Sequence, residues 1–109
     1  MKKLNILWTA FASNCLLEIH EYLLEETKSE TIANNYCNKL IESVEYLSTQ
    51  PEAGQIEHLL HKLGQNSRYI IERNYKIIYE YNEKQIIITD LFHTKQNPSK
   101  IFTRNKNEV

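Results

Sequence analysis

This 109-residue chain contains little cysteine or glycine and has no long apolar run. Two cysteines are too few for the disulfide framework of a small secreted scaffold. Cys15 and Cys37 occupy apolar positions of helical patterns, so we expect buried free thiols. Two glycines are too few for a phosphate-binding glycine loop. Because no stretch of about 18 apolar residues occurs, the sequence predicts no transmembrane helix.

The overall composition is typical of an ordered globular domain. Hydrophobic residues make up 41% of the chain and charged residues 25%, which is close to the averages for folded proteins. The first residues include two lysines, but Asn5, Ser13 and Glu18 interrupt the apolar stretch that follows, which argues against a secretory signal peptide. We therefore expect a cytoplasmic protein with a single domain over residues 1–98 and a polar tail over residues 99–109.

The net charge of −1 conceals a difference between the two halves of the chain. Residues 1–66 contain five Lys/Arg and nine Asp/Glu, a charge of −4, whereas residues 67–109 contain eight and five, a charge of +3. A weakly basic second half is compatible with a polyanionic partner. However, so small a total charge gives little non-specific attraction to nucleic acid.

Hydrophobic periodicity in the first half predicts one strand and two helices. Leu4–Thr9 alternates apolar and polar residues, as a strand does. Apolar residues then recur at helical spacing from Thr9, a suitable N-cap, to about Lys28, and again from Ser29 to Leu47. A proline soon after the second pattern ends it. Two helices joined so closely should form an antiparallel helical hairpin.

The second half predicts a three-stranded meander. Residues 55–66 have no clear pattern, although a short helical turn before Gly64 fits them. Asn74 is expected to supply the left-handed backbone of the first tight turn. Three runs rich in β-branched and aromatic residues follow one another: Arg68–Arg73, Tyr75–Tyr81 and Gln85–Thr94.

Alternation assigns the faces of these strands. We expect the last strand to be central, with Ile86, Ile88 and Phe92 on one face and Ile87 and Leu91 on the other. On the middle strand, the tyrosine-rich face should cover the helices: Tyr75, Ile77, Tyr79 and Tyr81. Arg68 and Lys76 should then point away from them. The fold class is therefore α+β: one sheet with the helical hairpin on one face and the other face free to bind a macromolecule.

Taken together, these motifs resemble the RelE/ParE toxin superfamily of bacterial type II toxin–antitoxin modules, whose members are often called plasmid stabilisation proteins. The resemblance extends over residues 4–98. It is carried by the order and spacing of an ILWT strand, P-x-x-G at Pro51–Gly54, R-x-I at Arg68–Ile70, NYKIIY at Asn74–Tyr79 and H-x-K-x-x-P at His93–Pro98.

The resemblance implies a toxin that a cognate antitoxin neutralises in a hetero-oligomer, with one of two targets. RelE-like members cleave messenger RNA on the ribosome as mRNA interferases, and ParE-like members poison DNA gyrase. Carried over by position, the nuclease set here would be Arg68, Lys76, His93 and Lys95, with His93 able to transfer a proton near neutral pH. Ile70 replaces a second basic residue, and the tail lacks the expected tyrosine.

This incomplete basic set and the near-neutral charge favour gyrase inhibition over mRNA cleavage, and leave open whether the protein is an enzyme. A toxin that has lost its toxicity and serves mainly as an antitoxin partner is a third reading. We expect no cofactor, no metal and no membrane partner. His58 and His61 form H-x-x-H but have no third ligand at a suitable spacing. Asp90 and His93 should point to opposite faces, so they form no catalytic dyad.

Overall fold

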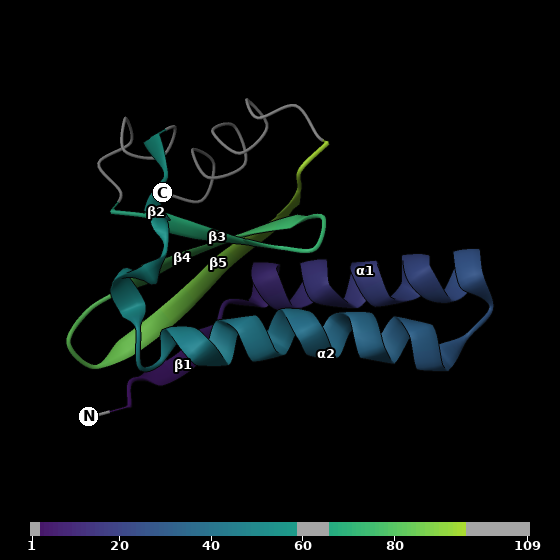
Figure 1. Cartoon of the computed structure of the whole chain (residues 1–109), viewed down its shortest axis with the longest axis horizontal. Coiled ribbons are helices and arrows are strands. Elements are labelled where there is room, and N and C mark those ends of the chain that lie inside the picture. The colour runs from purple at the N-terminus through teal and green to yellow at the C-terminus, as the bar shows by residue number, and fades with distance from the viewer. Residues whose placement is uncertain (1–2, 59–65, 96–109) are drawn as a thin grey trace.

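A computed structural model describes residues 3–58 and 66–95 of the chain (Figure 1). Its elements are, in chain order, β1 (Asn5–Trp8), α1 (Ala10–Thr27), α2 (Glu30–Leu47), the short 3-10 helix η1 (Pro51–Ala53), β2 (Gln55–Ile56), β3 (Arg68–Glu72), β4 (Tyr75–Tyr81) and β5 (Gln85–His93). Neither helix is long and apolar enough to cross a membrane, and the same holds throughout the described ranges.

The predicted α+β architecture is confirmed, with one strand more than expected. The described sheet has the order β1-β5-β4-β3-β2, with β1 parallel to β5 and the other neighbours antiparallel. The central position of β5 was predicted, whereas the two-residue strand β2 was not. The hairpin of α1 and α2 lies along one face of the sheet, and its closed end extends beyond it (Figure 1).

Side-chain caps fix where both helices begin. The hydroxyl of Thr9 accepts a hydrogen bond from the Ala12 amide, and that of Ser29 accepts one from the Ile32 amide. Such caps satisfy backbone donors that the first helical turn leaves without partners. Between the helices Lys28 adopts a left-handed conformation, with φ of 55°. The chain can therefore reverse within two residues.

The main core forms where the helical hairpin meets β4 and β5. Its fully buried side chains include Leu40, Val44 and Leu47 of α2 and Ile77, Tyr79, Ile86 and Ile88 of the sheet. Both cysteines are free thiols; Cys37 is buried and Cys15 partly so. Burial raises the pKa of the Cys37 thiol. The four residues of β4 that were predicted to face the helices all belong to this core.

A β-bulge in β5 corrects the predicted faces of its last residues. Tyr79 pairs with Ile88 and Ile78 pairs with Asp90, so Thr89 is one residue more than β4 can match. An extra residue reverses the alternation that follows it. Leu91 therefore packs in the helix-facing core and Phe92 on the outer face, the opposite of the prediction.

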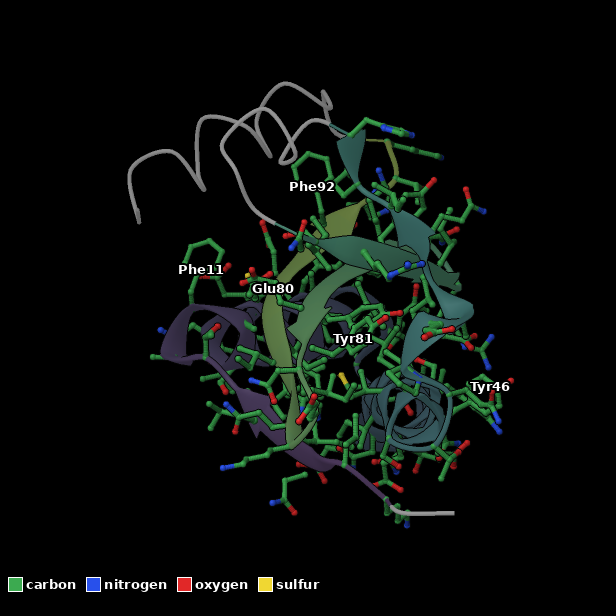
Figure 2. All side chains as sticks on the ribbon, turned by 90° about the vertical axis from the view of Figure 1, so that its left-hand side faces the viewer. Phe11, Tyr46, Glu80, Tyr81 and Phe92 are labelled. Carbon is green, nitrogen blue, oxygen red and sulfur yellow. The ribbon has the colours of Figure 1, made fainter. Side chains whose placement is uncertain are left out.

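The outer face is not as bare as the sequence led us to expect. Ile78 and Phe92 form a second hydrophobic cluster there with Tyr69, and both are buried. Figure 2 shows Phe92 pointing to the side of the sheet opposite α2. Asp90, which pairs with Ile78, is also fully buried. Ile78, Asp90 and Phe92 are therefore not accessible to a macromolecule.

The turn between β3 and β4 has two residues, Arg73 and Asn74, and Arg73 adopts the left-handed conformation that was predicted for Asn74. Glu72 consequently pairs with Tyr75. Because loop length fixes the register of a hairpin, this turn also decides which side chains of β3 share a face with Tyr79.

A buried tyrosine fastens the segment that follows α2. The Tyr79 hydroxyl donates to the carbonyl of Pro51 (2.6 Å) and accepts from the amide of Gly54 (2.9 Å). A Cβ on residue 54 would lie 2.5 Å from that hydroxyl, so only glycine allows the approach. Burial is the main reason why the pKa of Tyr79 is raised, which keeps the hydroxyl neutral and able to donate.

We expect Tyr79→Phe to lower the free energy of unfolding by about 1–3 kcal/mol, because it removes both hydrogen bonds and leaves the Gly54 amide unsatisfied. Gly54→Ala should also destabilise the protein. Tyr46→Phe is the matched control, since Tyr46 is 60% exposed. Urea unfolding followed by circular dichroism measures all three. Equal stabilities of the Tyr79 and Tyr46 variants would contradict this role.

Candidate functional site

The cation on the outer face, Lys76, is neutralised by a residue that sequence reasoning missed. Its ammonium group lies 2.7 Å from a carboxylate oxygen of Glu57, with 21% of the Lys76 side chain and 5% of the Glu57 side chain exposed. It also lies 4.1 Å from the centre of the Tyr69 ring, within cation–π range. Glu57 lies in the segment 55–66, whose sequence has no clear pattern, so the sequence did not predict this ion pair.

Arg68 lies on the helix-facing side of the sheet, not on the outer face. It pairs with Tyr79, and cross-strand partners share a face. Its guanidinium donates to the Gly54 carbonyl at 2.8 Å and lies 5.9 Å from the centre of the Tyr81 ring. The prediction that Arg68 and Lys76 share the outer face is therefore wrong, and Arg68 instead helps to hold the segment after η1.

His93 lies on the helix-facing side as well, at the far end of β4 from Arg68. It pairs with Tyr75, and the two rings meet edge to face with centroids 5.0 Å apart. Its Nδ1 accepts a hydrogen bond from the backbone amide of Lys95 at 3.0 Å. The Lys95 residue is exposed beyond the strand.

The four predicted residues do not converge. Arg68 and His93 are opposite Tyr79 and Tyr75, four residues apart on β4, a separation of about 13 Å along the strand. Lys76 belongs to the other face. Cleavage of RNA without a metal needs a base, an acid and a cation within hydrogen-bonding reach of one phosphate. Instead, Lys76 pairs with Glu57, Arg68 donates to the Gly54 carbonyl, and His93 packs against Tyr75.

The sequence predicted no zinc site at His58 and His61 and no catalytic dyad of Asp90 with His93. His58 is exposed and His61 lies outside the described ranges; within those ranges no three His, Cys, Asp or Glu side chains gather as metal ligands. Asp90 and His93 do point to opposite faces, and Asp90 lies near Cys15, with 3.8 Å between Oδ1 and Sγ.

Residues 6–98 match the family described as "ParE toxin of type II toxin-antitoxin system, parDE". The chain belongs to the ParE toxin family. Among solved structures, a chain of "Chromosomal ParDE TA system from P. aeruginosa" is similar in fold, with a TM-score of 0.68 and 16% identity. That alignment covers 87% of this chain and 100% of the other. No curated protein matches the chain.

Membership of this family agrees with the geometry of the described residues. The sequence resemblance to the RelE/ParE superfamily is confirmed, and the family that matches is a ParE toxin family. The structure adds that the strand cations of this chain support the fold.

We expect Glu57→Gln to lower the free energy of unfolding by about 1.5–3 kcal/mol, because it leaves the largely buried Lys76 ammonium without its counter-charge. Adding Lys76→Met should recover part of that loss. Glu25→Gln is the control, because the Glu25–Lys28 pair is exposed and exposed pairs contribute little. If the two glutamine variants unfold alike, the Glu57–Lys76 pair does not stabilise the sheet.

Proposed function

We propose that this protein inhibits bacterial DNA gyrase and is neutralised by a cognate antitoxin that binds over its surface. Membership of the ParE toxin family supports a toxin role. The observation that favours gyrase over messenger RNA is the dispersal of the cationic candidates. Lys76 is paired with Glu57 on one face, while Arg68 and His93 lie far apart on the other. A toxin that acts by binding needs no convergent acid, base and cation.

The charge of the chain supports the same reading. A net charge of −1 over 109 residues gives weak attraction to the phosphates of ribosomal or messenger RNA. The basic residues of the second half include Lys76, Arg68 and Arg73. The first two interact within the fold as described, and the Arg73 guanidinium lies 5.6 Å from the centre of the Tyr36 ring. Of these three, Lys76 is neutralised by the carboxylate of Glu57.

Purified protein added to gyrase, relaxed plasmid and ATP should inhibit supercoiling and accumulate cleaved gyrase–DNA complexes. The double variant Glu57→Gln with Lys76→Met, and the single variant His93→Gln, should retain most of this activity, because inhibition of gyrase by binding needs no acid–base chemistry from these side chains. Gel electrophoresis after detergent and protease treatment measures the cleaved complexes. In cells in which expression of the toxin is induced, mapped transcript ends should show no codon-phased cuts. Such cuts with unaffected gyrase would identify an mRNA interferase instead.

The antitoxin part of the proposal is supported by exposed apolar surface on the helical hairpin and by an open sheet edge. Leu17, Tyr22 and Ile32 are each at least half exposed on α1 and α2. β1 is the end strand of the described sheet. A helical segment can cover apolar side chains, and an extended one can pair with an edge strand.

Hydrogen exchange of the toxin–antitoxin complex should therefore show slower exchange than free toxin in α1 and α2, in β1, or in both. The interiors of β4 and β5 provide the internal control, because they are already protected by pairing on both sides. Unchanged exchange at both the hairpin and β1 would rule out this mode of neutralisation.

A further inference from the structure

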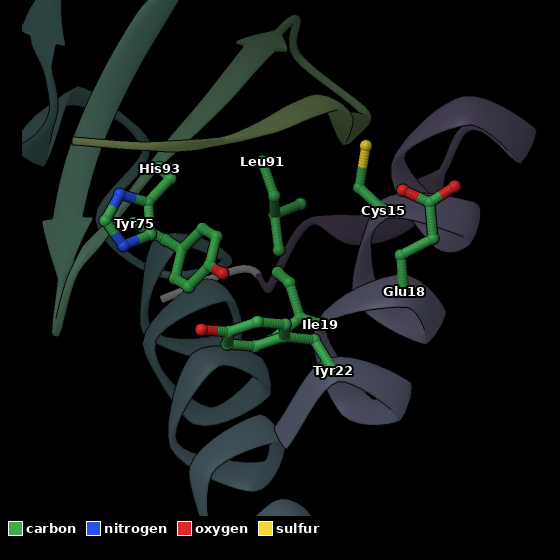
Figure 3. A pocket seen from close by; sticks show the side chains of 7 residues that line it. All are labelled: Cys15, Glu18, Ile19, Tyr22, Tyr75, Leu91 and His93. Carbon is green, nitrogen blue, oxygen red and sulfur yellow. The ribbon is translucent and has the colours of Figure 1, made fainter. Parts of the chain in front are cut away.

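A small pocket lies where α1 passes the end of β4 and β5 (Figure 3). Its volume is about 180 Å³, roughly six times the ~30 Å³ that one water molecule occupies in the liquid. It is thus smaller than most ligand pockets, which begin near 300 Å³, and has the size to hold one side chain. The lining residues are Cys15, Glu18, Ile19, Tyr22, Tyr75, Leu91 and His93.

The lining combines an apolar floor, aromatic walls and one carboxylate. Ile19 and Leu91, both at most 5% exposed, belong to the core. The rings of Tyr22 and Tyr75 lie beside them in Figure 3, and His93 follows behind Tyr75. The Nδ1 atom of His93 is already engaged by the backbone amide of Lys95. Burial and then the neighbouring tyrosines Tyr36 and Tyr22 raise the pKa of Tyr75, so its hydroxyl is uncharged.

Glu18 supplies the carboxylate of the lining. The residue is exposed and forms no ion pair with any described residue. The whole of α1 is negatively charged, because Ala10–Thr27 contains four glutamates and no lysine or arginine. Within the lining, Tyr22 is 61% exposed. This surface is complementary to a partner segment that is basic and partly apolar.

We propose that this pocket binds an arginine side chain of the partner protein that covers α1. A planar guanidinium can stack on tyrosine rings while it donates hydrogen bonds to a carboxylate, which a lysine ammonium does less well. Its three methylene groups match the apolar floor. Arginine is also one of the residues that contribute most to binding at protein interfaces. With the proposed function above, the partner is the antitoxin.

The site itself can be tested without any partner. Nα-acetyl-arginine amide, titrated into methyl-labelled protein, should shift the NMR signals of Ile19 and Leu91 in a saturable way. Nα-acetyl-citrulline amide, a neutral molecule of nearly the same shape, should bind at least tenfold more weakly, as should the arginine probe to Glu18→Gln. Glu21→Gln, on the same helix outside the lining, should bind like the wild type. Equal shifts with both probes, or an unaffected Glu18→Gln, would overturn the proposal.

The identity of the occupant is tested with the cognate antitoxin. By calorimetry, Glu18→Gln should weaken its binding at least fivefold, whereas Glu21→Gln should not. If both variants bind as tightly as wild type, the antitoxin does not place an arginine in the pocket. If wild-type toxin binds no antitoxin, the proposed function fails, and the titration with the two small probes still decides whether the pocket selects a guanidinium.

Discussion

The pairing of β4 with β5 is the constraint on which the rest of the molecule depends. These strands carry most of the sheet side of the core, and Thr89 interrupts their register with one extra residue. Without that residue, Leu91 and His93 would point away from α1, and Phe92 would point toward it. The pocket beside α1, the edge-to-face contact of Tyr75 with His93 and the buried outer cluster of Ile78 with Phe92 all follow from it. The Thr89 hydroxyl donates to the Ile78 carbonyl at 3.2 Å, within the bulge itself.

Periodicity was enough to predict the elements, but register decided the site. The helical hairpin, the cap at Thr9, the restart of the helical pattern at Ser29 and the three long strands depend on local patterns, and all are present. The face of Arg68 depends on whether one or two residues form the turn before Tyr75. If this turn changes in length by one residue, every side chain of β3 moves to the opposite face of the sheet. The bulge at Thr89 had the same effect on Leu91 and Phe92. Neither a two-residue turn that places Arg73 at positive φ nor an unmatched Thr89 leaves a mark in the pattern of apolar residues.

Contacts between distant segments were equally invisible in the sequence. Glu57 meets Lys76 across 19 residues, and the Gly54 amide meets Tyr79 across 25. The motif P-x-x-G could be recognised as a stop signal after α2, yet its glycine is required for another reason, the approach of a buried tyrosine hydroxyl. A requirement of this kind, such as the glycine at position 54, depends on which strands are neighbours. It can be recognised only once the order of the strands in the sheet is known.

The distribution of charge explains how a chain with a basic second half can favour a protein partner. Lys76, Arg68 and Arg73 interact with a carboxylate, a backbone carbonyl and aromatic rings of the same chain, and the charge of Lys76 is neutralised by its carboxylate partner. Among the described residues, the glutamates of α1 form no ion pair except for Glu25, which pairs with Lys28. The surface of the helical hairpin is therefore negatively charged, and it also carries exposed apolar side chains. A surface of this kind repels a nucleic acid and attracts a basic amphipathic segment. The electrostatics of the hairpin thus select for protein, and within the pocket the combination of Glu18 with two tyrosine rings selects for a guanidinium.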